Sequence, residues 1–137
     1  MQFIVAFMSL FIFFTLASAD TVRYDTAYDK AGQSMDTVSC SDGPNGLARR
    51  FPTFGSLPDF PNLGAAAAVA GWNSPSCGSC WQLTYNGVSI NVVAVDHADS
   101  GFNIALEAMN TLTDGQAEFL GTVEATVTRI DASQCGL

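Results

Sequence analysis

Asp96 is the residue in this sequence most suited to chemistry on a bound ligand. It follows the apolar run Val92–Val95, which is typical of a buried strand, so its carboxylate is expected to emerge at a strand end. A glycosidase needs a general acid and a second carboxylate, roughly 5 to 9.5 Å apart depending on mechanism. Asp42 and Asp99 are candidates for the same surface, but no recognisable spacing pairs either one with Asp96. Since one acid can accept hydrogen bonds without completing a hydrolytic pair, we predict a binding protein and not an enzyme.

Small polar residues around Asp96 could line a groove that reads sugar hydroxyls. Gly101 would let a ligand approach the backbone closely, because glycine has no Cβ. The same residue types are also what turns require, so that alternative stays open. The predicted carbohydrate-binding residues are Asp96, Ser100, Gly101 and Asn103, with Ser41, Asp42 and Asn45 facing them from an earlier segment.

The aromatic side chains and the single histidine are further candidates for contact with a ligand. Tyr24, Trp72 and Trp81 could stack on a ligand, but Trp81 directly follows Cys80 at a strand start and is expected in the core. No nucleophile motif accompanies His97, which we interpret as a loop or turn histidine. One histidine and scattered acids have no metal-ligand spacing, so neither a metal nor another cofactor is expected.

The chain has four cysteines, an even number that indicates two disulfides in a short secreted protein. Four cysteines permit three pairings, and spacing alone does not choose among them. Cys77 and Cys80 form a C-x-x-C motif, for which a redox pair or half of a zinc site is the alternative. No thioredoxin-like context surrounds it, and an oxidising compartment favours disulfides over four zinc-binding thiolates.

The N-terminus has the pattern of a secretory signal. An apolar run covers residues 3 to 16, interrupted by Ser9 and Thr15, and Ala17-Ser18-Ala19 follows as an A-x-A cleavage pattern. A membrane anchor is the alternative, but the run is shorter than the roughly 20 residues that span a bilayer. We predict a signal peptide over residues 1–19, one domain over residues 20–137, and an extracellular or cell-wall location.

Charge limits the possible partners. Five basic residues stand against thirteen acidic ones, giving a net charge of −8. Without a basic cluster the protein should bind neither nucleic acid nor anionic membranes. Uncharged sugars remain possible partners, because they require hydrogen bonds and flat apolar surface instead of positive charge.

Alternating and β-rich segments dominate the chain after residue 20. Residues 21–25 and 123–128 alternate as strands, and the runs 81–85 and 88–95 are separated by Asn86-Gly87, which indicates a type I′ hairpin. Residues 39–46 read as a loop, and the three prolines within residues 52–61 favour a connection with extended pieces.

Short helices are expected between these strands. Residues 64–71 are alanine-rich and weakly helical, and residues 103–112 can form a helix. Thr113-x-x-Gln116 has the form of a capping box, and Gly121 suits the position after a helix end. The pattern is mainly β with short helices and favours a small closed barrel, which leaves no exposed strand edge.

Several motifs occur in the order found in a known family. They are Ser39–Gly43 with Asn45–Leu47, Gly71–Trp81, Ala94–Asp96 with Gly101–Asn103, Ala108–Asn110 with Leu112–Thr113, and Cys135–Leu137. The match extends over nearly all of residues 20–137, and the chain resembles the cerato-platanin family of secreted fungal proteins.

The resemblance implies a six-stranded double-psi β-barrel, like the first domain of expansins, with bridges Cys40–Cys77 and Cys80–Cys135. Asp96 matches the aspartate that lines the polysaccharide groove in expansin-like barrels. The expected partners are cell-wall polysaccharides, namely chitin or N-acetylglucosamine oligomers and cellulose, which would be loosened without hydrolysis.

Other functions follow from the same resemblance. It implies elicitation of plant defence or immune modulation in animals, with host immune receptors as partners, and self-assembly at interfaces. An antigen without a working sugar groove, a weak glycoside hydrolase and a surfactant-like coat protein remain alternatives.

Overall fold

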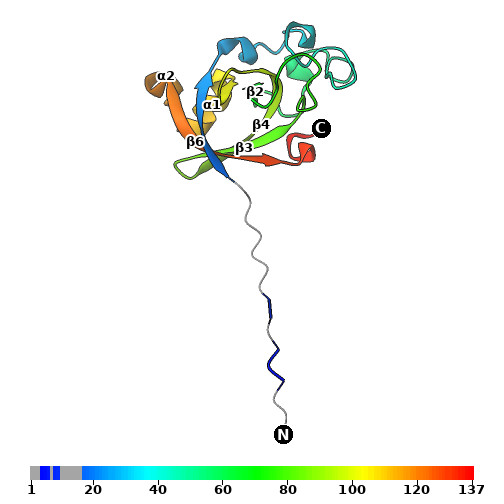
Figure 1. Ribbon diagram of the computed structural model, residues 1–137. Helices are drawn as coiled ribbons and strands as arrows, with labels where there is room; N and C mark the ends of the chain where they lie inside the picture. Colours follow the sequence, from blue (N-terminus) through cyan, green and yellow to red (C-terminus); the bar gives the residue numbers. More distant parts are fainter. Residues whose placement is uncertain (1–3, 7, 10–16) are drawn as a thin grey trace.

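The protein folds as a closed six-stranded barrel with short helices, as expected from the sequence (Figure 1). The computed structural model describes residues 4–6, 8–9 and 17–137. Around the barrel the strand order is β1-β5-β2-β4-β3-β6, with parallel β1–β5 and β2–β4 pairs and the other pairs antiparallel. The strands are β1 Ser18–Tyr24, β2 Leu63–Ala66, β3 Cys80–Tyr85, β4 Val88–His97, β5 Phe102–Ile104 and β6 Thr122–Ile130.

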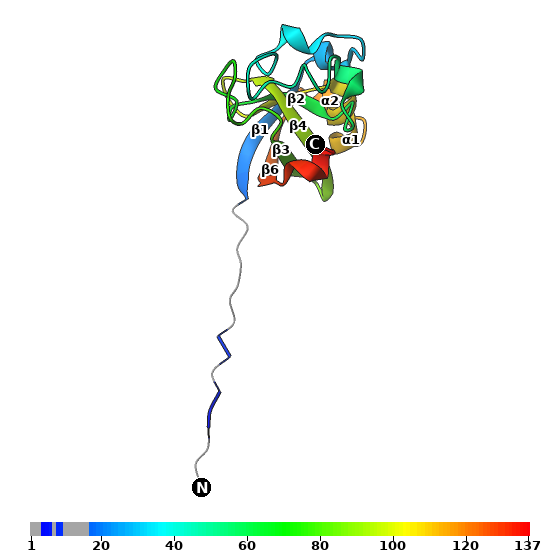
Figure 2. The same cartoon turned by 90° about the vertical axis from the view of Figure 1, so that its right-hand side faces the viewer.

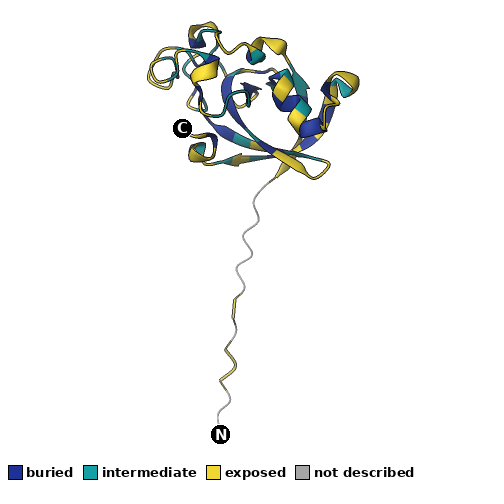
Figure 3. Ribbon diagram, turned by 180° about the vertical axis from the view of Figure 1, so that it is seen from behind, coloured by how far each residue is buried: buried dark blue, intermediate teal, exposed yellow. Residues whose placement is uncertain are grey.

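Two α-helices and several 3-10 turns complete the described part. Helix α1, Leu106–Thr113, buries Ala108, Met109 and Leu112 and exposes its other side, a division that Figure 3 shows by colour. Helix α2, Ala117–Leu120, follows it. The 3-10 turns are η1 Thr26–Asp29, η2 Met35–Thr37, η3 Phe54–Ser56 and η4 Ala132–Cys135. The segments between β1 and β2 gather above the strands in both Figure 1 and Figure 2.

The hairpin between β3 and β4 confirms the sequence prediction. Asn86 and Gly87 have φ of 47° and 79°, as a type I′ turn requires of both central residues. The pairs run from Tyr85 with Val88 to Cys80 with Val93. This turn therefore sets the register of the long strand β4, which carries Asp96.

The helix predicted over residues 64–71 is wrong. The segment holds the end of β2 and a turn, and Leu63, Ala65 and Ala66 are buried between β4 and β5. A Cβ on Gly64 would lie 2.4 Å from the Asn103 carbonyl oxygen. The small residues are needed for close approach of neighbouring strands, and this packing overrides the weak helix propensity of alanine.

The helix predicted over residues 103–112 starts too early, and the predicted capping box is absent. Asn103 belongs to β5, and α1 begins only at Leu106. Thr113 ends α1, and its hydroxyl donates to the Met109 carbonyl at 2.8 Å, so it caps no following helix. The N–H of Ala117 donates instead to Oδ1 of Asn110. Gly121 follows α2 with φ 70°, which confirms its predicted place at a helix end.

Both cystine bridges have the pairing implied by the family resemblance. Cys40 is bonded to Cys77, and Cys80 to Cys135. All four cysteines are thereby oxidised, which excludes the zinc site and a redox pair within the C-x-x-C motif. The first bridge joins two loops at one end of the barrel, and the second ties the start of β3 to η4.

The predicted signal peptide falls largely on residues outside the described ranges, and its cleavage stays a prediction. Strand β1 starts at Ser18, so cleavage before Asp20 would remove two paired residues and keep every pair with β5. No helix in the described ranges is both long and apolar enough to span a membrane.

Candidate functional site

A line of residues crosses four neighbouring strands at one end of the barrel. Arg23 of β1 pairs with Asn103 of β5, Asn103 pairs with Ala65 of β2, and Ala65 pairs with Asp96 of β4. Directly paired residues point to the same side of a sheet, so these four side chains share one face. We call them the polar row; the small, buried Ala65 lies between the two polar members Asn103 and Asp96.

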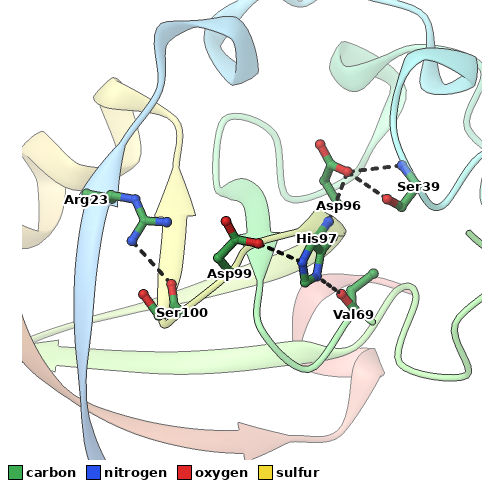
Figure 4. A network of polar contacts seen from close by, with 7 residues as sticks. All are labelled: Arg23, Ser39, Val69, Asp96, His97, Asp99 and Ser100. Carbon is green, nitrogen blue, oxygen red and sulfur yellow. Dashed lines mark hydrogen bonds and ion pairs between the residues drawn. The ribbon is translucent and has the colours of Figure 1, made fainter. Parts of the chain in front are cut away.

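Asp96 is held by four donors from the protein itself. Its Oδ1 accepts from the Ser39 N–H at 3.1 Å, the Ser39 hydroxyl at 2.9 Å and the His97 N–H at 2.9 Å (Figure 4). Its Oδ2 accepts from the Tyr28 hydroxyl at 2.9 Å. A carboxylate has about four lone-pair sites, two on each oxygen, so Oδ2 is the oxygen with capacity for a ligand hydroxyl.

The Tyr28 hydroxyl keeps its proton at physiological pH and can therefore donate to Asp96. Burial raises the pKa of its hydroxyl first, and the adjacent Asp96 carboxylate raises that pKa further. Tyr28 comes from η1 and Ser39 from the loop after η2, so Asp96 fastens both segments to the end of β4.

Asn103 is a second member of the polar row with unused hydrogen-bonding capacity. Its side chain is half-buried, and its Oδ1 is buried with no hydrogen-bond partner among the residues that the structure describes. Leaving such an atom unpaired costs about 1–3 kcal/mol, which is often a sign of a functional position.

His97 bridges two loops beside the polar row. Its Nδ1 donates to the Val69 carbonyl at 2.6 Å, and its Nε2 lies 3.2 Å from the carboxylate of Asp99 (Figure 4). The Val69 carbonyl raises the pKa of His97 most, and Asp99 raises it further. The residue predicted to lie in a loop is thus the last residue of β4, and it engages one of the two acids considered as partners for Asp96.

Ser100 and Gly101 lie immediately before β5, next to Asn103. The guanidinium of Arg23 donates to the Ser100 carbonyl at 3.2 Å. Gly101 has φ 55°, and a Cβ there would lie 2.2 Å from the Thr21 carbonyl oxygen. The close neighbour that requires glycine at this position is therefore strand β1; a ligand role for Gly101 stays a prediction.

The remaining predicted site residues form a second group. The indole N–H of Trp72 donates to Oδ1 of Asp42 at 2.6 Å, and the Ser41 hydroxyl donates to the same atom at 3.3 Å. Asn45 makes two hydrogen bonds with Asn73, at 2.9 and 3.1 Å. Within residues 17–137, no side-chain hydrogen bond of Ser41, Asp42 or Asn45 reaches the polar row.

Sequence reasoning missed Arg23, Tyr28 and Ser39 as parts of the site. They lie on separate segments, and strand register and tertiary hydrogen bonds bring them to Asp96 and Asn103. No local pattern in the sequence marks them. In the described ranges, no group of three or more His, Cys, Asp or Glu residues is arranged to hold a metal ion.

Comparisons with known proteins agree on one family. The family model described as cerato-platanin matches residues 20–137. Allergen Asp f 15 of Aspergillus fumigatus is 52% identical over 115 residues, covering 84% of this chain and 76% of the allergen.

Solved structures give the same result. Cerato-platanin 2 from M. perniciosa has a TM-score of 0.85 and 50% identity, with 88% of this chain and 100% of that chain covered. The solution structure of the fungal elicitor Cerato-Platanin has a TM-score of 0.77 and 40% identity, covering 84% of this chain and 95% of that chain.

Proposed function

Since the chain belongs to the cerato-platanin family, we propose that it is a secreted protein that binds uncharged cell-wall polysaccharide without cleaving it. The proposed ligands are chitin or cellulose chains. The polar row is the observation that supports this proposal best, because it places hydrogen-bonding side chains from three strands, β1, β5 and β4, on one face.

The three polar residues of the polar row offer different kinds of hydrogen bond. Arg23 donates, Asp96 accepts through Oδ2, and Asn103 can donate through its side-chain NH₂, since its Oδ1 is a buried atom. Sugar hydroxyls are themselves donors and acceptors, so a chain lying across the strands can pair with all three. Such contacts compete with those between polysaccharide chains, which would loosen a wall without any covalent step.

Binding without hydrolysis fits the hydrogen bonds that the candidate acidic residues already make within the protein. Hydrolysis needs one carboxyl group to deliver a proton and another to act as base or nucleophile. Asp96 accepts four internal hydrogen bonds, Asp99 faces His97, and Asp42 accepts from Trp72. All three candidate acids are thus engaged by donors in the fold, which suits ligand binding and positioning better than proton transfer.

Titration with N-acetylglucosamine and glucose hexamers, run beside a reducing-sugar assay, tests this function. We expect saturable binding, no release of reducing ends, and about tenfold weaker binding for Asn103→Ala, equivalent to about 1.4 kcal/mol. Asn91→Ala, a half-buried β4 position outside the polar row, is the matched control and should bind normally. Two results would contradict the proposal. One is failure of the unmodified protein to bind either hexamer. The other is release of reducing ends by the unmodified protein that Asp96→Ala abolishes.

Recognition by a host immune system is the second candidate function. It is favoured by the similarity to an allergen and to a fungal elicitor, and by loops that two cystine bridges hold in place. This function does not require the polar row. Defence or immune activity that survives Asn103→Ala yet disappears on reduction would support it, whereas loss in Asn103→Ala would tie the response to sugar binding.

A further inference from the structure

We propose a second carbohydrate contact, centred on Trp72 and separate from the polar row, that takes an uncharged sugar ring. It consists of the exposed Trp72 side chain and a neighbouring cleft, which we call the Trp72 cleft because Trp72 contacts two of its lining residues, Asp42 and Gly43. The cleft has a volume of about 720 Å³ and is lined by Asp36, Ser41, Asp42, Gly43, Pro44, Gly46, Ala48, Arg49 and Arg50.

Trp72 is an aromatic surface held in a fixed orientation. Its side chain is 63% exposed, although its indole N–H is tied to Asp42 at 2.6 Å. A Cβ on Gly43 would lie 3.1 Å from Cζ2 of Trp72, so the ring edge rests against this glycine. With its polar edge and one ring edge fixed, the apolar face remains free to stack on a ligand.

The two loops that carry this surface are joined to each other. Asn45 makes two hydrogen bonds with Asn73, and the Cys40–Cys77 bridge links the same two loops. The two loops are therefore already ordered before a ligand stacks on Trp72. Preorganisation of this kind raises affinity by lowering the entropic cost of binding.

The charges in the Trp72 cleft favour an uncharged ligand. Arg49 and Arg50 supply donors, and no ion pair involving either is present in residues 17–137. Asp36 and Asp42 supply acceptors, so the four formal charges cancel locally in a protein of net charge −8. A mixed set of donors and acceptors matches sugar hydroxyls, and the volume is within the range of about 300–1,000 Å³ seen for ligand pockets.

If one polymer chain spans both the polar row and the Trp72 cleft, its binding is bivalent, and its apparent affinity exceeds that of either contact alone. The Trp72 contact is argued from its own residues, and it stands or falls independently of the polar row.

The two tryptophans of the chain allow a direct test by NMR of the ¹⁵N-labelled, disulfide-bonded protein. Trp81 is the internal control, because its indole N–H donates to Ser79 at 2.8 Å and its ring packs on Phe102. On titration with the N-acetylglucosamine hexamer, we expect the Trp72 indole signal to shift and the Trp81 signal to stay. The Trp72 shift should persist in Asn103→Ala, which separates this proposal from the polar row.

Variants sharpen the test. Trp72→Ala should weaken binding about tenfold and Trp72→Phe much less, because the phenyl ring keeps a face for stacking. Asp42→Asn keeps an acceptor for the indole and should preserve the shift, whereas Asp42→Ala should reduce it. A stationary Trp72 signal while the hexamer binds, or a shift with a galacturonic acid trimer but not with the neutral hexamer, would overturn the proposal.

Discussion

At the scale of single residues, Asp96 shows how one carboxylate can serve the fold and a ligand at once. Three donors converge on Oδ1, and Tyr28 alone reaches Oδ2. The oxygen with fewer partners is therefore the one that a ligand can use, and its position depends on Tyr28.

Tyr28→Phe tests this dependence. The substitution keeps the buried ring against Phe54 but removes the hydroxyl that donates to Asp96. Hydrogen bonds to charged groups contribute about 1.5–3 kcal/mol, so the free energy of unfolding should fall by about that amount. Guanidinium unfolding measures it, with Tyr85→Phe as the control. Equal losses in the two variants would contradict the assigned role of the Tyr28 hydroxyl.

Asp59 is a residue whose charge works against the folded state. Burial raises the pKa of its carboxyl group to about 7, and within the described part of the chain its buried Oδ2 has no hydrogen-bond partner. Between about pH 4 and pH 7 the folded protein keeps this proton while the unfolded chain has lost it. The contribution of Asp59 to the free energy of unfolding is therefore most favourable below about pH 4 and falls as the pH rises to 7.

Asp59→Asn should remove this pH dependence. The amide is nearly the same size and never ionises, so the melting temperature should rise relative to the unmodified protein at pH 8, by a few degrees, and change little at pH 4. Calorimetric scans at the two pH values measure the difference. The exposed Glu124→Gln on β6 is the control for a general loss of negative charge, and an identical pH profile for Asp59→Asn and the unmodified protein would refute the prediction.

At the scale of elements, the short strands β2 and β5 determine whether the polar row exists. They have four and three residues, and they connect β1 to β4 across the barrel. Their closeness depends on Gly64, where a Cβ would lie 2.4 Å from the Asn103 carbonyl oxygen and 2.6 Å from the Ile104 Cα. Backbone atoms of a neighbouring strand cannot move aside cheaply.

Gly64→Ala should therefore destabilise the protein by about 3 kcal/mol or more and weaken sugar binding through the polar row. Gly71→Ala is the matched control, because a Cβ at that glycine meets nothing within 4 Å. Denaturant midpoints compare the two variants. Similar midpoints would show that β2 and β5 tolerate separation, contrary to this account.

At the scale of the whole molecule, two cystine bridges restrict the unfolded chain. They span 37 and 55 residues of sequence, for which the chain-entropy model gives about 4 kcal/mol each. Net stabilities of small domains are about 5–15 kcal/mol, so the bridges account for much of the total. The loops that carry Trp72 and Ser39 depend on the first bridge in particular.

Reduction should lower the melting temperature sharply, while the oxidised protein withstands heating. The double variant Cys40→Ser, Cys77→Ser should lose about 4 kcal/mol and should also broaden the Trp72 indole signal, because the two linked loops come apart. Calorimetry with and without reductant measures the first effect, and NMR the second. A double variant as stable as the unmodified protein would disprove this role for the bridge.

Much of this molecule follows from local patterns in the sequence. The Asn86-Gly87 hairpin, the strands around residues 21–25 and 123–128, and the glycine after α2 were predicted correctly, because turn geometry and side-chain alternation depend on neighbouring residues. The resemblance to the family supplied the cystine pairing and the barrel, which spacing alone left open.

Only the tertiary structure decided which polar residues meet. Register across four strands aligned Arg23, Asn103 and Asp96, and it placed residues 64–66, the start of the predicted helix, in strand β2. A hydrogen bond between distant loops joined Asp42 to Trp72. These outcomes depend on contacts between segments far apart in the chain. Such contacts contribute more free energy than local propensity does, and they leave no periodic signal in the sequence.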